Sequence, residues 1–78
     1  MDTLVQVQNI IAATLGAPLA RVHPQSKAAD FPEWDSLRHL VLVIEIEQAF
    51  GCKFALEEIA ELDSVEKIVT AVQQRVKS

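Results

Sequence analysis

The chain has 78 residues, 50% of them hydrophobic, with 7 Lys and Arg against 11 Asp and Glu. A chain this short is expected to form one small domain, residues 1–78, whose thin core leaves no room for a large enclosed active site. The net charge of −4 and the pI near 4.9 argue against nucleic acid as a partner, because that partner requires a basic surface. No apolar run approaches the roughly 20 residues that cross a bilayer, so we expect a soluble protein without membrane insertion. We also expect a monomer.

The single cysteine, Cys52, cannot form a disulfide within the chain, and the N-terminus lacks the basic-then-apolar layout of a secretion signal. Both features predict the reducing cytoplasm. Cys52 is predicted to be a small, partly buried residue, because the single neighbouring cation, Lys53, activates a thiol only weakly. His23 has no second His or Cys at ligand spacing, so we expect no metal site.

The first predicted element is an amphipathic helix at the N-terminus. Leu4, Val7, Ile11 and Leu15 recur at spacings of three and four, and Gly16 ends the pattern. This spacing places the four side chains on one face of the helix.

Residues 17–34 show no sustained period and contain all three prolines, so they are predicted to form one 18-residue loop. Loops of this length in compact domains are usually functional or disordered. Val22, Phe31 and Trp34 favour a packed loop with Phe31 in the core, because large apolar side chains are costly to expose together. Trp34 is either an anchor of this loop or a partner contact.

The second helix is predicted from Leu37 to Phe50, with Asp35 as its N-cap and Gly51 as its terminator. It is apolar nearly all round, and a domain of 78 residues cannot cover it on every side. We therefore expect part of this helix to meet a partner or ligand. The predicted core side consists of Leu42, Val43, Ile46 and Phe50, and the outer side of Leu37, Leu40, Val41 and Ile44.

A short helix is predicted from Leu56 to Leu62, and the last helix is predicted to begin at a capping box formed by Asp63 and Glu66. No run alternates long enough for a sheet. The predicted fold is all-α: a small four-helix bundle of three long helices and one short, with a long loop between the first and second helices. The apolar stripe of the last helix comprises Val65, Ile68, Val69, Val72 and Val76, and its basic C-terminal end Arg75 and Lys77.

Negative charge is concentrated in the middle of the chain. Glu57, Glu58, Glu61 and Asp63 cluster on and after the short third helix. This cluster either attracts a basic partner or is simply a solvated face.

The long loop joins the apolar helix at the tripeptide Asp35-Ser36-Leu37. A serine in the first turn of a helix is exposed, and the unpaired N–H groups there favour a phosphodiester on its oxygen, as does the positive end of the helix dipole. Asp35, Ser36 and His39 are also the three residue types of a hydrolase triad. Adjacent residues on a helix point in different directions, however, and no cleft is evident, so no catalytic residues are expected.

This tripeptide, at the start of a helix after a long loop, resembles the attachment motif of the acyl carrier protein family. Residues 47–51, 56–59 and 63–65 are similar to the end of the second helix, the acidic third helix and the start of the last helix in that family. The resemblance covers most of the chain.

The resemblance implies a 4′-phosphopantetheine arm attached covalently to Ser36, in a site that includes Asp35 and Leu37. Acyl groups would be carried as thioesters on this arm and would tuck between helices, in a space lined on its core side by Leu42, Val43 and Ile46. The protein is then a substrate of a phosphopantetheinyl transferase and of acyl-loading and acyl-transferring enzymes, and is not itself an enzyme.

Members of the family usually present acids just after the serine, where this chain has Arg38, His39 and Val41. This departure favours a specialised carrier in a polyketide, modified-lipid or amino-acid-derived pathway over general fatty acid biosynthesis. The predicted partner contacts are Arg38, His39, Val41, Glu45, Glu47, Glu57 and Glu58.

Two alternatives remain open. An aminoacyl or peptidyl carrier would hold the same arm with a different cargo, and a carrier-like helical interaction module would leave Ser36 unmodified. The start at Met1 and the lack of linker sequence favour a stand-alone carrier over an excised module.

Overall fold

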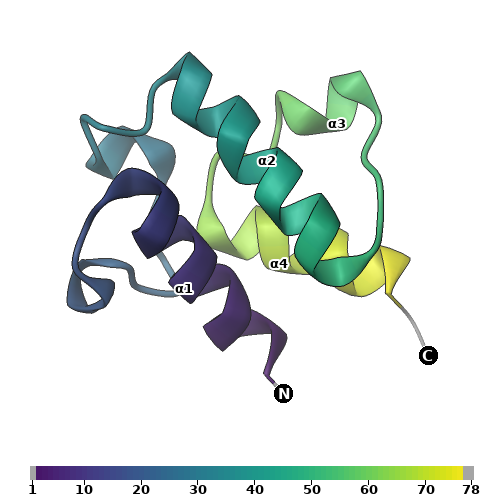
Figure 1. Ribbon diagram of the computed structural model, residues 1–78, viewed down its shortest axis with the longest axis horizontal. Helices are drawn as coiled ribbons and strands as arrows, with labels where there is room; N and C mark the ends of the chain where they lie inside the picture. Colours follow the sequence, from purple (N-terminus) through teal and green to yellow (C-terminus); the bar gives the residue numbers. More distant parts are fainter. Residues whose placement is uncertain (1, 77–78) are drawn as a thin grey trace.

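The computed structural model describes residues 2–76, and this part of the chain contains four α-helices and two short 3₁₀ helices (Figure 1). No strand is present in this described part, so the predicted all-α class, with three long helices and one short, is confirmed. No helix within residues 2–76 is long and apolar enough to cross a membrane. The elements are α1 (Thr3–Leu15), η1 (Leu19–Arg21), η2 (Ala28–Asp30), α2 (Ser36–Phe50), α3 (Leu56–Ile59) and α4 (Val65–Arg75).

The start and end of α2 are set by Asp35 and Gly51. The Asp35 carboxylate accepts a hydrogen bond from the Arg38 amide at 2.8 Å, as an N-cap does. Gly51 ends the helix at φ 64°, and Gly16 ends α1 at φ 67°, both in the left-handed region that glycine adopts without steric cost. The predicted N-cap and terminators are confirmed, and α2 begins one residue earlier than predicted, at Ser36.

The predicted capping box of the last helix is wrong. Ser64, not Asp63, is the N-cap of α4, and its hydroxyl accepts a hydrogen bond from the Lys67 amide at 3.1 Å. The reason is the isolated bridge between Lys27 and Ser64, which holds Ser64 in an extended conformation directly before the helix. The Asp63 carboxylate instead forms an ion pair with Lys67 at 3.1 Å, and Glu66 lies within the first turn.

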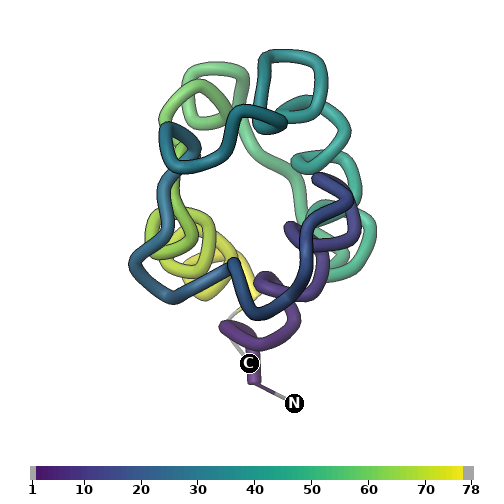
Figure 2. The backbone as a smooth tube through the Cα atoms, turned by 90° about the vertical axis from the view of Figure 1, so that its left-hand side faces the viewer, coloured from purple at the N-terminus to yellow at the C-terminus, as the bar shows by residue number. Residues whose placement is uncertain are grey.

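The core lies where α1 packs against both α2 and α4. Figure 2 shows the backbone closing around this core, with residues 17–34 running from α1 past the start of α4 to α2. Val22, Phe31 and Trp34 are buried, which confirms the packed loop and the place of Phe31 in the core. The buried apolar side chains are Val7, Ile11, Ala12, Leu15, Val22, Phe31, Trp34, Leu42, Val43, Ile46, Phe54, Leu62, Val65, Ile68, Ala71 and Val72.

Two predicted boundaries in the C-terminal half need correction. The helical segment predicted to reach Leu62 ends at Ile59, after which i to i−3 hydrogen bonds carry the chain through turns, although Leu62 itself is buried. Val76 is 47% exposed and lies outside the apolar stripe, because α4 ends at Arg75. Lys77 lies outside the described residues.

Candidate functional site

Ser36 is the first residue of α2, and its side chain is exposed. The neighbouring Asp35 carboxylate binds the Arg38 amide and so fixes where the helix starts. The other amides of the first turn lie at the positive end of a dipole that runs along 15 residues. An anionic group bonded to the Ser36 oxygen is therefore stabilised by this position.

An open groove of about 470 Å³ lies beside Ser36, between α2 and α3. Its lining is mostly apolar, so it suits an aliphatic chain better than a charged ligand. Leu42, Val43 and Ile46, predicted to lie on the core side of the space for the acyl chain, are buried on the core side of α2 and are not part of the lining of this groove. The groove is lined by Ala28, Trp34, Asp35, Ser36, His39, Leu40, Leu56, Ile59, Ala60 and Asp63.

The side of the groove formed by α3 was missed from the sequence. Leu56 and Ile59 stand one helical turn apart, which was the available signal for an apolar face. Leu56 is 84% exposed at the rim, whereas Ile59 is half-buried against the core.

Trp34 and His39 form a hydrogen-bonded chain across this groove. The indole Nε1–H of Trp34 donates to Nδ1 of His39 at 3.0 Å, and His39 Nε2 lies 2.7 Å from the carbonyl oxygen of Ile59. Trp34 is 7% exposed and packs next to Phe31, with ring centroids 6.3 Å apart, so its role as a loop anchor is confirmed. Both imidazole nitrogens have partners other than Ser36, which agrees with the rejection of a hydrolase triad.

Comparison with known proteins identifies the class of this site. The profile of the family described as phosphopantetheine attachment site matches residues 5–72. The acyl carrier protein of Rubrobacter xylanophilus is 34% identical over 71 residues, which cover 91% of this chain and 88% of that protein. The chain belongs to the acyl carrier protein family.

Two further relatives are more distant. Acyl carrier protein 3 of Ralstonia nicotianae is 29% identical over 96% of this chain and 86% of its own length. The acyl carrier protein of Solidesulfovibrio magneticus is 27% identical over 96% of both chains. The prosthetic group of the family is 4′-phosphopantetheine, and this member is a carrier protein rather than an enzyme.

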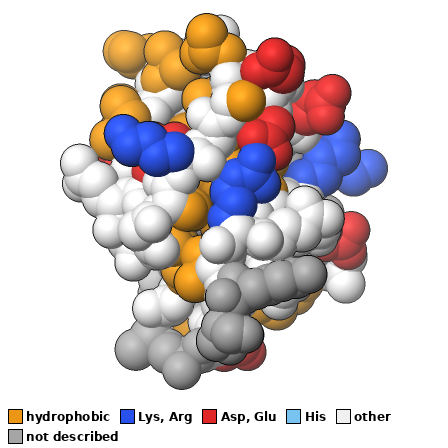
Figure 3. All heavy atoms as spheres, turned by 90° about the vertical axis from the view of Figure 1, so that its right-hand side faces the viewer, with side chains coloured by type: hydrophobic (Ala, Val, Ile, Leu, Met, Phe, Trp, Pro, Cys, Tyr) orange, Lys and Arg blue, Asp and Glu red, His pale blue; other side chains and the backbone are white. Residues whose placement is uncertain are grey.

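The two faces of α2 in this acyl carrier protein have opposite environments, as predicted. Leu42, Val43 and Ile46 are buried, while four apolar residues on the outer face are between 41% and 69% exposed. Figure 3 shows hydrophobic side chains gathered at the top of the molecule, next to acidic ones, at the level of the start of α2 and of α3 in Figure 1. The four outer residues are Leu37, Leu40, Val41 and Ile44.

The polar residues predicted as partner contacts divide into two groups. Glu45 and Glu57 are exposed, as is Arg38, whose guanidinium lies 3.4 Å from the carbonyl oxygen of Leu15 at the end of α1. His39 bonds with Trp34 and Ile59, as described above. Glu47 and Glu58 form hydrogen bonds within the fold.

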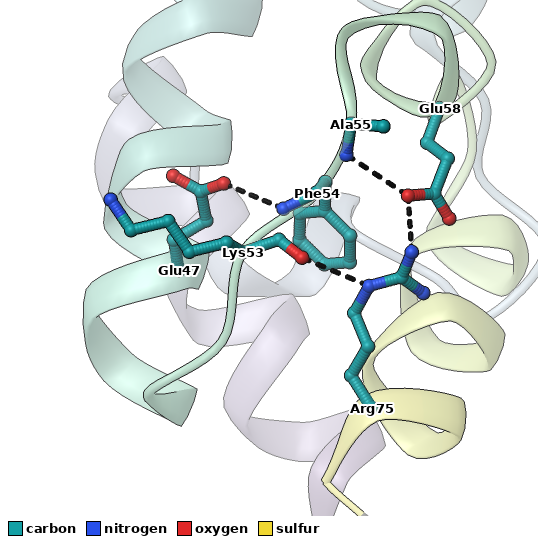
Figure 4. Close-up of polar contacts among 6 residues, drawn as sticks. All are labelled: Glu47, Lys53, Phe54, Ala55, Glu58 and Arg75. Carbon is teal, nitrogen blue, oxygen red and sulfur yellow. Dashed lines mark hydrogen bonds and ion pairs between the residues drawn. The ribbon is translucent and has the colours of Figure 1, made fainter.

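Figure 4 shows how those two carboxylates hold the segment between α2 and α3. Glu47 accepts a hydrogen bond from the Phe54 amide at 2.9 Å, and Glu58 accepts one from the Ala55 amide at 3.0 Å. Both carboxylates therefore stabilise the chain on its way into α3. The Ala55 hydrogen bond, together with Arg75, holds the pKa of Glu58 below its ordinary value of 4.5.

Arg75 is the residue of this region whose role the sequence did not reveal. It forms an ion pair with Glu58, its Nε donates to the Lys53 carbonyl at 2.9 Å, and its guanidinium lies 5.0 Å from the Phe54 ring centroid (Figure 4). The sequence had indicated only that a base at this position complements the helix dipole. Partners 17 and 22 residues away leave no local pattern.

Cys52 is half-buried, as predicted for a residue without a chemical role. Burial raises the pKa of the Cys52 thiol and the nearby Glu47 carboxylate raises it further, so the nucleophilic thiolate is disfavoured. Residues 2–76 contain no group of three or more His, Cys, Asp or Glu side chains arranged to hold a metal ion.

Proposed function

We propose that Ser36 carries the 4′-phosphopantetheine arm through a phosphodiester bond and that acyl groups travel on this arm as thioesters. The observation that supports this most directly is an exposed hydroxyl on the first residue of α2, next to an apolar groove. The arm supplies the thiol that forms the thioester. The residues of the chain supply attachment, orientation and shelter.

Each part of the site has a distinct task in this proposal. The amides of the first turn stabilise the phosphodiester, and Asp35 fixes the start of α2 from which Ser36 projects. Asp35 is also a recognition residue for the phosphopantetheinyl transferase, and Leu37 presents an apolar contact beside the serine. The groove between α2 and α3 takes up apolar cargo and limits the access of water.

We further propose that acyl-loading and acyl-transferring enzymes bind the outer face of α2. Its exposed apolar residues, flanked by Arg38 and Glu45, and Glu57 on α3 are the contacts. Because a cation follows the serine and the face is largely apolar, we propose a specialised carrier with dedicated partners, one that acts in the cytoplasm as a single domain over residues 1–78. The aminoacyl or peptidyl carrier remains the alternative.

The salt dependence of partner binding tests the apolar character of this face. Docking through ion pairs weakens steeply with ionic strength, whereas docking through apolar contact changes little. We expect kcat/KM of the loading transferase to fall less than about threefold between low and physiological salt. A steeper fall would contradict an apolar docking face.

Attachment is tested by intact mass before and after incubation with coenzyme A, Mg²⁺ and a broad-specificity phosphopantetheinyl transferase. We expect one addition of roughly 340 Da, lost in Ser36→Ala. The matched control is Ser64→Ala, because Asp63-Ser64-Val65 repeats the same kind of tripeptide at the start of α4. No addition with several transferases would favour the unmodified interaction module. Loss of the addition in Ser64→Ala but not in Ser36→Ala would place the arm on Ser64.

A further inference from the structure

The hydrogen bonds around His39 determine which tautomer its ring adopts. An indole Nε1–H can only donate, so Nδ1 of His39, 3.0 Å from Trp34, must be unprotonated and accept. The ring proton of the neutral imidazole then resides on Nε2, which donates to the Ile59 carbonyl at 2.7 Å. One neutral tautomer therefore satisfies both neighbours, and the other would satisfy neither.

The carbonyl of Ile59, which accepts this hydrogen bond, belongs to a helix with little stability of its own. Ile59 is the last residue of α3, a helix of four residues that is too short to be stable by its own hydrogen bonds. Two polar contacts join α3 to the other helices: Glu58 forms an ion pair with Arg75 on α4, and the Ile59 carbonyl accepts a hydrogen bond from His39 on α2. The ion pair of Glu58 lies on the side of α4, and only the hydrogen bond of Ile59 crosses the groove beside Ser36.

We infer that His39 is a positioning residue which, as the Nε2–H tautomer, holds α3 against α2 and so keeps the two walls of the open groove beside Ser36 in place around apolar cargo. Trp34 selects the tautomer, because its indole N–H requires an acceptor at Nδ1 of His39. The buried Trp34 is thereby coupled through His39 to α3, which forms one wall of the groove. The position of α3 follows from hydrogen bonds already described, while the effect on cargo rests on the proposed function of Ser36.

Three variants separate the two hydrogen bonds of His39. In His39→Asn the side-chain oxygen occupies the place of Nδ1 and accepts from Trp34, but the side chain is too short to reach Ile59. In His39→Gln the terminal amide occupies the place of Nε2 and donates to Ile59. His39→Leu removes both bonds, and His23→Gln, at the only other histidine, which is exposed, is the matched control.

The position of α3 is tested on the protein without the arm. We expect ¹⁵N chemical shifts of the imidazole to report the Nε2–H tautomer, and amide exchange over residues 56–62 to rise about two- to tenfold in His39→Asn and His39→Leu. His39→Gln and His23→Gln should exchange as the unchanged protein does. An Nδ1–H tautomer, or equal exchange in all variants, would overturn the inference; the Asn and Gln pair decides it even if His39→Leu fails to fold.

The shelter of the cargo is tested on the protein loaded with an octanoyl thioester. We expect hydroxylamine to cleave the thioester about two- to tenfold faster in His39→Asn and His39→Leu than in His39→Gln or His23→Gln. Equal cleavage in variants whose α3 exchange has changed would overturn the sheltering role. If Ser36 accepts no arm, the proposed function fails, and the tautomer and exchange data still decide the position of α3.

Discussion

Two similar tripeptides stand at the start of two helices of this protein. The helix begins at the second residue of one tripeptide and at the third residue of the other. In Asp35-Ser36-Leu37 the aspartate is the N-cap, so Ser36 becomes the first helical residue and its side chain is exposed. In Asp63-Ser64-Val65 the serine is the N-cap, and its hydroxyl is used for the Lys67 amide. The same residue types therefore produce a presented hydroxyl in one place and a structural one in the other.

The tertiary contacts around the two tripeptides account for the difference. Backbone hydrogen bonds from the Ala28 amide to the Asp63 carbonyl at 2.8 Å and from the Val65 amide to the Ser26 carbonyl at 3.0 Å hold Ser64 extended. Asp35 instead follows the buried Trp34, which anchors the loop and leaves the aspartate at the helix boundary. Tertiary packing, more than the tripeptide itself, decides which serine is available for modification.

The largest effect should come from removing the buried ring of Phe31, next to which the loop anchor Trp34 packs. Phe31→Ala deletes a buried ring, and we expect a loss of about 3 to 5 kcal/mol in the free energy of unfolding, close to the whole stability of a domain of this size. Urea unfolding followed by circular dichroism measures it. Leu19→Ala, in the same loop but 49% exposed, should stay within about 0.5 kcal/mol. An unfolding curve of Phe31→Ala that matches the unchanged protein contradicts a loop anchored by this ring.

A crossed set of four substitutions sharpens the comparison of the two tripeptides. Asp35→Ala and Ser64→Ala each remove an N-cap, and we expect each to cost about 1 kcal/mol. Ser36→Ala and Asp63→Ala remove an exposed hydroxyl and an exposed ion-pair partner, which should cost about 0.5 kcal/mol or less. Urea unfolding of all four variants gives these differences.

Loading and stability should move independently in this set. Ser36→Ala should lose the arm while keeping its stability, and Ser64→Ala should lose stability while keeping the arm. Asp35→Asn, which retains an accepting side-chain oxygen, should recover most of the stability lost in Asp35→Ala. Equal stability losses in Ser36→Ala and Ser64→Ala would contradict the assignment of Ser64 as an N-cap and of Ser36 as an exposed first helical residue.

The sequence predicted features that depend on nearby residues and failed where distant residues decide. The caps of α2, the two glycine terminators and the burial of Leu42, Val43 and Ile46 follow from local spacing and side-chain chemistry. The N-cap of α4 depends instead on a bridge to Lys27, 37 positions earlier, which no local pattern reveals.

The candidate site shows the same division. The Asp35-Ser36-Leu37 motif predicts an attachment point for an arm from local facts alone, namely the residue types and their place before an apolar helix, and the structure places Ser36 exposed at the start of α2. The hydrogen bond between His39 and the Ile59 carbonyl joins residues 20 positions apart, so the sequence indicated His39 only as a partner contact.

The segments leading to the two tripeptides each contain a carboxylate paired with an arginine, and acid should loosen both. Glu33 pairs with Arg21 at 3.3 Å before Ser36, and Glu58 pairs with Arg75 before Ser64. A hydrogen bond from its own backbone, together with Arg21, holds the pKa of Glu33 below its ordinary value of 4.5. The Ala55 amide and Arg75 have the same effect on the pKa of Glu58.

The sign of the pH dependence follows from these two lowered values. The unfolded chain binds protons at these carboxyl groups before the folded chain does, so the contribution to stability is complete above the ordinary pKa of 4.5 and is lost as the pH falls through the lower folded-state pKa. The effect should be the smallest predicted here, because solvent screens exposed ion pairs. Urea unfolding at pH 7 and pH 3 should show a smaller pH-dependent loss in Glu33→Gln/Glu58→Gln than in the unchanged protein. Glu57→Gln, at an exposed neighbour on α3, should leave that loss unaltered, and an unaltered loss in the double variant would remove these two pairs as its cause.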